Sequence, residues 1–389
     1  MRILHTSDWH LGRSFHGEDL LAAQAAYLDH VVDTIEKENV DLVVVAGDVY
    51  DRALPPVDAV ALADDAFRRL ATSRAHVVVT SGNHDSARRL GFNARLVELA
   101  GLHLRTDAGR VAEPVLLDDE HGPVAVYGIP YLEPDVLRHA WQLSTRSHHA
   151  ALGHAMELIR ADLASRPAGT RSVVVAHAFV AGGLASDSER DIAVGGVSVV
   201  PVGLFDGIDY TALGHLHGRA TLAEAVRYSG SPIAYSFSET GQVKGSWLVD
   251  LDADGLNATR FIEAPVQRRL ACLEGTVEEL LGDPSLAGAE DCWVQATLTD
   301  VVRPANAMDR LRARFPHTIT LRFAPPGAGP APARPSTIGR APHEIALDFV
   351  RHVRGEPASA AESELLRTAL ECCSEDPDLV PGRDSVVSG

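Results

Sequence analysis

Short apolar runs recur between residues 2 and 213, and each has the length of a buried β-strand. They are rich in Val, Ile and Leu, and continuous apolar runs of this kind are typical of strands that are covered on both faces. The pattern therefore predicts five buried strands, at residues 2–5, 41–46, 76–80, 172–176 and 209–213.

Between the first three runs, the spacing of the apolar residues changes to that of helices. Residues 20–38 and 57–70 both show this spacing, so the first half of the chain is predicted to alternate between strand and helix. Strand-like segments near 245–251 and 258–263 are expected to complete a second sheet. The predicted fold class is α+β, with an α/β-like first half.

A different region begins at Pro265. Strand candidates around a helix near 304–314 predict a small α+β unit. Residues 324–342 are rich in Pro, Ala and Gly, which is typical of a flexible linker. Two helices follow, and a Ser359-x-x-Glu362 capping box opens the second. The strand candidates are 293–298 and 318–323, and the predicted domains are 1–264, 265–323, 324–342 (the linker) and 343–389.

Polar side chains follow each of the five apolar runs, at the point where the predicted strand ends. In sheets of this class, binding crevices form where loops leave the carboxyl ends of strands, so five such ends can converge on one site. The residues are Asp8 and His10, Asp48, Asn83 with His84 and Asp85, His177, and His215 with His217.

This set is typical of a metal site with oxygen and nitrogen ligands. It contains no thiolate, which favours Mn, Fe, Zn or Mg over softer ions. Asp48 is the natural bridging carboxylate, because one shared negative group lets two cations lie roughly 3.5 to 4 Å apart. Two such cations can bind a phosphodiester and activate water. His84 is placed to protonate the leaving oxygen, and Asp85 to orient or charge its imidazole.

Composition and charge narrow the class of protein. The 389 residues are 46% apolar, and no apolar stretch reaches the roughly 18 to 20 residues of a membrane span. The amino end shows no signal-peptide pattern and the cysteines show no C-x-x-C spacing, so we expect a cytoplasmic protein without disulfides. The net charge of -18 argues against a broad basic surface, so cations, local arginines or a partner must supply positive charge if DNA is bound.

Four arginines near these motifs have two interpretations. Arg13, Arg52, Arg88 and Arg89 lie within a few residues of the predicted ligands. In one interpretation they contact a DNA backbone. In the other they are solvated surface residues or members of ion pairs, and the sequence favours neither.

The combined motifs resemble those of a known family. The set D-x-H, GD, GNHD, H and GHLH is that of the calcineurin-like metallophosphoesterases, and within them the chain is similar to the SbcD nucleases of bacteria. The similarity rests on SDWHLGRSFHG at 7–17, GDVYDR at 47–52, SGNHDS at 81–86, DYTALGHLHG at 209–218 and YSGSP at 228–232, and it extends to LTD at 298–300.

The resemblance implies a fold and a ligand set. The family has a four-layer β-sandwich of two mixed sheets flanked by helices, followed by a small capping domain and C-terminal helices. His84 would be the catalytic acid, and this chain has Asp51 where archaeal relatives carry His. By position, Asp8, His10, Asp48 and His217 would bind one Mn ion, and Asp48, Asn83, His177 and His215 would bind the other.

The resemblance also implies an activity and partners. It predicts a Mn-dependent DNA nuclease, with double-strand 3′ to 5′ exonuclease and single-strand or hairpin endonuclease activity, in DNA repair, recombination and replication. The chain would form a homodimer joined to the ATPase SbcC through its C-terminal helices, within a heterotetramer. It contains no G-x-x-x-x-G-K-[ST] sequence, so ATP use would belong to SbcC.

Two alternative functions stay open at this point. GDVYDR also resembles the GD-x-x-DR pattern of phosphatases, which would fit a phosphoprotein phosphatase or a small phosphodiesterase. GNHD in place of the phosphatase GNHE argues against that alternative. The other is a non-catalytic scaffold that binds metal and DNA ends, although a scaffold would need no proton donor such as His84.

Overall fold

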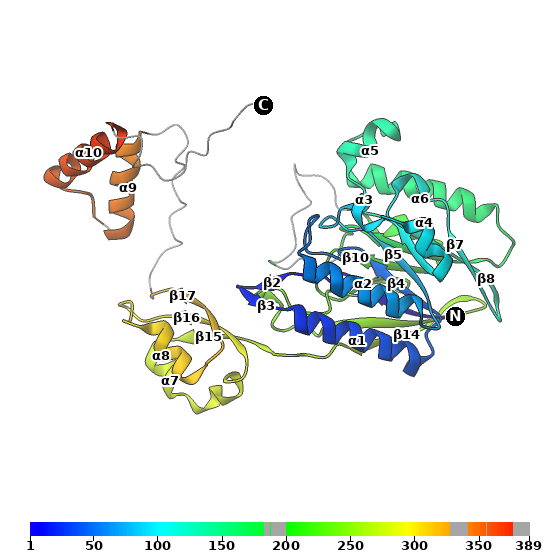
Figure 1. The fold of residues 1–389 in the computed structure, drawn as a ribbon, viewed down its shortest axis with the longest axis horizontal. Coiled ribbons are helices and arrows are strands. Elements are labelled where there is room, and N and C mark those ends of the chain that lie inside the picture. Colours follow the sequence, from blue (N-terminus) through cyan, green and yellow to red (C-terminus); the bar gives the residue numbers. More distant parts are fainter. Residues whose placement is uncertain (183–186, 188–199, 327–340, 355, 376–389) are drawn as a thin grey trace. The chain divides into compact units, whose positions relative to one another are not determined.

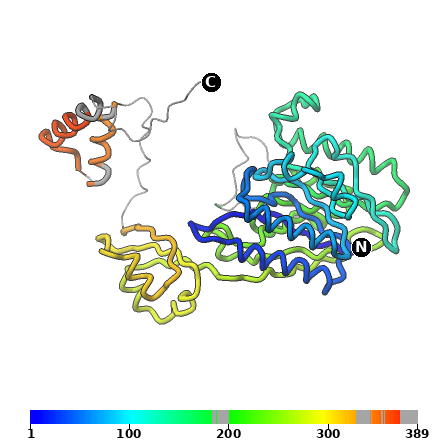
Figure 2. The backbone as a smooth tube through the Cα atoms, viewed as in Figure 1, coloured from blue at the N-terminus to red at the C-terminus, as the bar shows by residue number. Residues whose placement is uncertain are grey.

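The structure, a computed structural model, describes residues 1–182, 187, 200–326, 341–354 and 356–375. The chain divides into two compact units, Met1–Pro326 and Gly327–Gly389. Figure 2 traces the backbone and draws the other residues in grey.

A six-stranded sheet forms one half of the larger unit, and three of the predicted apolar runs are its central strands. β4 (Leu42–Ala46) shows why such a run is apolar throughout. Val43 and Val45 pack toward helices on one face, whereas Leu42 and Val44 pack into the core on the other. Across the sheet the order is β14 (Gly255–Glu263), β13 (Gly245–Asp252), β1 (Arg2–Thr6), β4, β5 (His76–Thr80) and β6 (Leu102–Arg105).

A second six-stranded sheet is built in the same way around β9 (Arg171–His177), which is buried along its whole length. Its four inner strands run parallel, and an antiparallel strand lies at each edge. The order is β11 (Ala220–Ala223), β12 (Val226–Tyr228), β10 (Tyr210–Gly214), β9, β8 (Gly122–Ile129) and β7 (Val115–Asp119).

The two sheets pack face to face, and helices cover their outer faces, so the unit has four layers (Figure 1). Between the sheets, Val44 and Val78 of the first pack with Val126 and Val175 of the second. The outer helices are α1 (Leu21–Glu38) and α2 (Val57–Ala71) on the first sheet, and α5 (Pro134–Ala140) and α6 (His148–Ala164) on the second. This arrangement confirms the predicted four-layer β-sandwich. The expectation that the segments near 245–251 and 258–263 complete the second sheet is wrong, because β13 pairs with β1 and β14 pairs with β13 in the first sheet.

Residues after Pro265 form a small sheet with its own core. Its three strands run parallel, and two helices pack on it. Trp293 also packs against Phe15 of the main sandwich, with the ring centroids 5.5 Å apart. The elements are β15 (Leu270–Gly275), α7 (Val277–Gly282), β16 (Trp293–Leu298), α8 (Ala307–Arg314) and β17 (Thr318–Phe323). The predicted α+β unit is therefore present, with β15 and α7 in addition.

The smaller unit contains two helices that pack against each other, α9 (Pro342–Arg354) and α10 (Ala360–Glu375). The predicted capping box is formed. The amide of Ser359 donates to the Glu362 carboxylate at 2.7 Å, and the amide of Glu362 donates to the Ser359 hydroxyl at 3.3 Å. Residues 327–340 of the predicted linker lie outside the described residues. Within the described part of the chain, no helix has both the length and the apolar character that a membrane span requires.

Candidate metal centre

The predicted ligands come together at the carboxyl ends of the central parallel strands. β1 and β4 continue to pair beyond their ends, because the amides of Asp8 and His10 donate to the carbonyls of Gly47 and Asp48 at 3.0 Å each. The amide of His215 donates to the Asp8 carboxylate at 3.1 and 3.2 Å. This contact joins the two sheets through residues 207 positions apart in the sequence.

Four predicted ligands have a positive φ, which residues other than glycine rarely adopt. The angle is 53° at Asp8, 46° at His10, 51° at Asp48 and 109° at His215. Such angles cost of order 1 to 3 kcal/mol each and persist only where the surrounding contacts hold them. Their concentration at these strand ends is therefore typical of a functional site.

Two glycines let the backbone approach the ligands more closely than any other residue would allow. A Cβ on Gly47, where φ is 82°, would lie 2.3 Å from Nδ1 of His177. A Cβ on Gly82 would lie 2.1 Å from Oδ1 of Asp48. The glycines of the GD and GN motifs are thus required by the close packing of the site.

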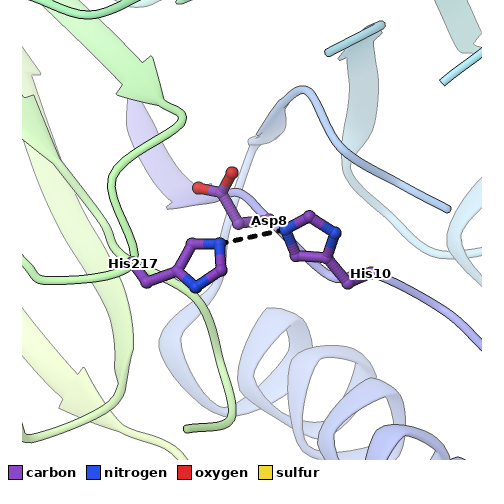
Figure 3. A group of neighbouring side chains, drawn as sticks. All are labelled: Asp8, His10 and His217. Carbon is purple, nitrogen blue, oxygen red and sulfur yellow. Dashed lines mark hydrogen bonds between the residues drawn. The ribbon is translucent and has the colours of Figure 1, made fainter. Parts of the chain in front are cut away.

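Asp8, His10 and His217 form one compact group (Figure 3). Nε2 of His10 lies 3.0 Å from Nε2 of His217 and 3.6 Å from Oδ2 of Asp48. All four residues are buried, with at most 2% of their surface exposed. Their donor atoms therefore face one small space.

Asn83, His177 and His215 form the neighbouring group. Nε2 of His177 lies 2.9 Å from Oδ1 of Asn83 and 3.5 Å from Oδ2 of Asp48. Nδ1 of His215 lies 3.3 Å from the same Asn83 oxygen. Asp48 thus contacts His177 on one side and His10 on the other, which is the position expected of a bridging carboxylate.

Burial keeps the four imidazoles neutral. Desolvation lowers the pKa of His177 to about 3, and it lowers the pKa of His10 and of His215 well below the ordinary value. It also lowers the pKa of His217, although the neighbouring Glu239 carboxylate opposes that shift. A neutral imidazole offers a lone pair to a metal, so these histidines are in their ligating form.

The donor set fits divalent cations. Carboxylate and imidazole groups suit Mn, Fe, Zn or Mg, and the cluster does not select among them. In each of three groups, the ligand atoms lie within 4.8 Å of one another: Asp8, His10 and His217; Asp8, Asp48 and His177; and His10, Asp48 and His84.

His84 lies at the edge of this cluster with its ring held in place. Its Nδ1 donates to the backbone carbonyl of Asp51 at 2.7 Å, and its amide donates to Oδ1 of Asp48 at 2.9 Å. The ring centroid is 4.7 Å from that of His10. Because Nδ1 is engaged in this hydrogen bond, Nε2 is the ring nitrogen available for proton transfer.

Asp85 has a different position from the one expected. Its carboxylate accepts hydrogen bonds from the backbone amides of Val49, Tyr50 and Gly82. Burial raises its pKa to about 6. Asp85 therefore secures the loops that carry the ligands, and the contact that orients the His84 ring comes from the Asp51 carbonyl.

The four arginines differ in their surroundings. Arg13 is largely buried, and its Nε lies 3.7 Å from Oδ1 of Asp51. Arg52 is exposed and lies 3.5 Å from Oδ2 of the same carboxylate. Arg88 and Arg89 are exposed. The ion-pair interpretation thus describes Arg13 and Arg52 in this structure, while DNA contact stays a prediction for all four.

Three polar residues lie behind the ligands, and two of them lie outside the motifs of the sequence. The Ser7 hydroxyl donates to Oδ2 of Asp8 at 2.5 Å. Oε1 of Glu239 lies 3.5 Å from Nδ1 of His217, and the Lys244 ammonium donates to the His217 carbonyl at 2.8 Å. Ser7 belongs to a motif that was already recognised. Glu239 and Lys244 belong to none, and only their burial in the fold reveals them.

Two family models match the chain. The model of the calcineurin-like phosphoesterases matches residues 1–219, which contain all the predicted ligands. The model of the SbcD C-terminal domain, described as the type 5 capsule protein repressor C-terminal domain, matches residues 266–343. The pair of matches confirms the predicted resemblance to the SbcD proteins.

Three solved structures are similar at low levels. TT1561 of Thermus thermophilus is 17% identical, with a TM-score of 0.40 over 67% of this chain and 98% of the other. GAP50, the anchor in the inner membrane complex of Plasmodium, is 13% identical, with a TM-score of 0.40 over 85% and 99%. The purple acid phosphatase PPD1 from yellow lupin (Lupinus luteus) seeds is 12% identical, with a TM-score of 0.37 over 69% and 54%.

The family assignment rests on the first family model, which covers more than half of the chain. The buried cluster of Asp and His side chains lies inside the matched region and is suited to metal ions. This combination indicates a metal-dependent hydrolase. The chain belongs to the calcineurin-like phosphoesterase family.

Proposed function

We propose that this protein is a Mn-dependent DNA nuclease that hydrolyses phosphodiester bonds with two divalent cations. The observation that carries the proposal is the convergence of Asp8, His10, Asp48, Asn83, His177, His215 and His217 in a chain that also matches the SbcD C-terminal domain. Double-strand exonuclease and single-strand or hairpin endonuclease activity, in DNA repair and recombination, are part of this proposal.

The two cations, when bound, would neutralise phosphate charge and lower the pKa of an attacking water. The protein's own residues then have three tasks. Asp48 holds the two halves of the site together through its contacts to His10 and His177. His84 transfers a proton to the leaving oxygen from the ring nitrogen opposite its bond to the Asp51 carbonyl. The buried walls exclude bulk water, which strengthens electrostatic interactions inside.

The charge of the chain supports a partner in DNA binding. A net charge of -18 leaves little general attraction for a polyanion. The match to the SbcD C-terminal domain hints at a complex with SbcC. We propose that SbcC binds the helices α9 and α10, that two copies of this chain form a homodimer in the resulting heterotetramer, and that the assembly works in the cytoplasm.

Two alternatives remain to be separated from this proposal. A phosphoprotein phosphatase or small phosphodiesterase would use the same metal cluster on a different substrate. A non-catalytic DNA-end scaffold would bind metal and DNA without cleavage. The held orientation of His84 favours catalysis over the scaffold, because a scaffold needs no positioned proton donor.

The test compares wild type with Asp48→Asn. Cleavage of single-stranded and hairpin DNA is measured with Mn, without Mn, and with SbcC and ATP added, and a phosphopeptide serves as the competing substrate. We expect DNA cleavage that depends on Mn and falls by orders of magnitude in Asp48→Asn, because the shared carboxylate is weakened.

The same experiment can reject the proposal. Phosphopeptide hydrolysis without DNA cleavage would assign the chain to the phosphatases. DNA binding without cleavage, even with SbcC and ATP, would favour the scaffold. Equal cleavage by both proteins would identify a contaminating nuclease.

A further inference from the structure

A buried pair of opposite charges lies directly behind one of the predicted metal ligands. Glu239 is 1% exposed and Lys244 is 7% exposed, although charged side chains are rarely buried to this degree unless they are paired. Nζ of Lys244 donates to Oε2 of Glu239 at 2.5 Å. Removal of either side chain would therefore leave the other charge buried without its partner.

Lys244 also connects the loops around the site. Its ammonium donates to the His217 carbonyl at 2.8 Å, to the Ser231 hydroxyl at 3.0 Å and to Oε1 of Gln242 at 2.8 Å. The amide of Ser231 donates to the His217 carbonyl at 3.1 Å. The YSGSP motif thus packs on the backbone of a predicted ligand, and Lys244 forms hydrogen bonds to both segments.

Glu239 faces the imidazole of the same ligand. Its Oε1 lies 3.5 Å from Nδ1 of His217, whose Nε2 points toward Nε2 of His10 at 3.0 Å. The other carboxylate oxygen, Oε2, accepts from the amide of Tyr235 at 3.2 Å. The Lys244 ammonium pairs with this carboxylate and favours its ionised form, which only accepts hydrogen bonds. It can therefore accept the Nδ1 proton and leave Nε2 free for a cation.

The neighbouring group is supported differently. Nδ1 of His177 donates to the backbone carbonyl of Ala46 at 2.9 Å, which is a neutral acceptor. Hydrogen bonds to an ionised acceptor are stronger than those to a neutral one, so a carboxylate behind an imidazole raises its basicity more than a carbonyl does. The two groups of ligands therefore differ in the acceptor behind the imidazole, which is a carboxylate at His217 and a backbone carbonyl at His177.

We propose that Glu239, held by Lys244, is a positioning residue for His217 and gives the cation site at Asp8, His10 and His217 a higher affinity than the site at Asn83, His177 and His215. The inference rests on the proposed metal ligands. It does not depend on DNA being the substrate. Loss of such an outer partner typically lowers metal affinity about 10- to 100-fold.

The test uses MnCl2 titrated into the metal-stripped full-length protein, followed by calorimetry and by electron paramagnetic resonance of bound Mn. The variants are Glu239→Gln, Lys244→Met and the double variant. Glu98→Gln is the matched control, because Glu98 pairs with His103 at 3.2 Å and Arg105 at 2.7 Å outside the cluster. Thermal unfolding in EDTA reports the stability of each variant.

We expect wild type to bind two Mn ions with unequal affinity, and Glu239→Gln to weaken the tighter one about 10- to 100-fold and to change its resonance spectrum. The double variant leaves no buried charge unpaired, so its unfolding temperature recovers toward wild type. The Mn affinity of the double variant should stay low, because this variant still lacks the Glu239 carboxylate behind His217. Glu98→Gln keeps both affinities.

A purely structural role gives a different result. Wild-type Mn affinity in Glu239→Gln, or its recovery in the double variant, would overturn the inference. If Glu239→Gln does not fold, the double variant alone decides by the same criterion. A wild type that binds no Mn would overturn both the proposed ligands and this inference, whereas one that binds two Mn ions but leaves DNA intact would fail only the proposed substrate.

Discussion

Gly47 illustrates how a single residue shapes the site. It precedes the predicted bridging ligand Asp48, has a φ of 82°, and lies where a Cβ would be 2.3 Å from the His177 ring. Its role therefore combines two separate demands, a positive φ and the absence of a side chain. A second glycine, Gly17, has a φ of 91°, but a Cβ there would meet nothing within 4 Å.

This contrast gives the first prediction. Gly17→Ala should cost only backbone strain, about 1 to 2 kcal/mol of unfolding free energy. Gly47→Ala should cost more and should also weaken Mn binding, because the added methyl group displaces the His177 imidazole. Urea unfolding in EDTA and Mn titration calorimetry measure the two effects. Equal losses in both variants would show that the contact with His177 has no consequence.

His84 gives the second prediction at this scale. His84→Gln should lower kcat for DNA cleavage about 10²- to 10⁴-fold, because the glutamine cannot supply a proton to the leaving oxygen. Mn affinity should stay at the wild-type level, since His84 is assigned as an acid and not as a ligand. His149→Gln, an exposed histidine of α6, is the control. Unchanged turnover, or loss of a bound Mn, would reject the assignment.

At the scale of elements, His5 of β1 joins the first sheet to the second. One ring nitrogen lies 2.8 Å from the Tyr210 hydroxyl of β10, and the other lies 3.1 Å from the Leu213 carbonyl. Only the second nitrogen needs a proton, so the neutral ring satisfies both partners. Burial lowers the pKa of His5 to about 3.

The third prediction follows from this shift. The unfolded chain binds a proton at His5 below about pH 6.5, whereas the folded chain does so only near pH 3. Stability is therefore fully present above pH 6.5 and is lost as the pH falls toward 3; His177 contributes in the same sense. Urea unfolding in EDTA between about pH 7 and 4 should show this decline. The decline should be shallower in His5→Gln, and an unchanged slope would exclude His5 as a source.

Elements differ in how far the sequence predicts them. β4 and β9 are recognisable because strands buried on both faces are continuously apolar. The edge strand β7 alternates buried and exposed positions over only five residues, which is a weak signal. α6 was not predicted, although Ser147 caps it and its buried residues follow helical spacing. That helix could have been found from the sequence.

At the scale of the whole molecule, the predicted homodimer can be tested by substituting apolar residues on the surface. Large apolar side chains are exposed on α2 and on the segment of α4 (Ala94–Val97), and both helices contact β6. The exposed fraction of the side chain is 82% for Val57, 44% for Val60, 75% for Phe92, 63% for Leu96 and 86% for Leu99. Exposed apolar side chains gathered in one place often mark interfaces between proteins, and Phe92, Leu96 and Leu99 lie within one short stretch of the chain.

The fourth prediction assigns this surface to the second copy of the chain. Leu96→Glu combined with Leu99→Glu should shift the protein from dimer to monomer in sedimentation velocity, because a charge in an apolar interface is unfavourable. Leu116→Glu, at a position 54% exposed on β7, should leave the dimer intact. Dimers in the double variant would place the interface elsewhere.

The fifth prediction concerns the C-terminal helices. Removal of residues 340–389 should abolish binding to SbcC, since α9 and α10 form their own compact unit with Phe349 66% and Leu365 74% exposed. The two predicted Mn sites should be unaffected, because every predicted ligand lies in the larger unit. Co-purification with SbcC and Mn titration measure the two effects. A truncated chain that still binds SbcC would refute this placement.

The sequence by itself determined the chemical types of the candidate ligands and their order, because each follows a strand that its own apolar pattern reveals. It also determined the four-layer fold class through the family motifs. Only the tertiary structure decided which groups support those ligands. Glu239 and Lys244 contact His217, Asp85 accepts from the amides of Val49 and Tyr50 rather than orienting His84, and the Asp51 carbonyl orients that ring. Such contacts depend on packing between segments distant in the chain, and local spacing carries no signal for them.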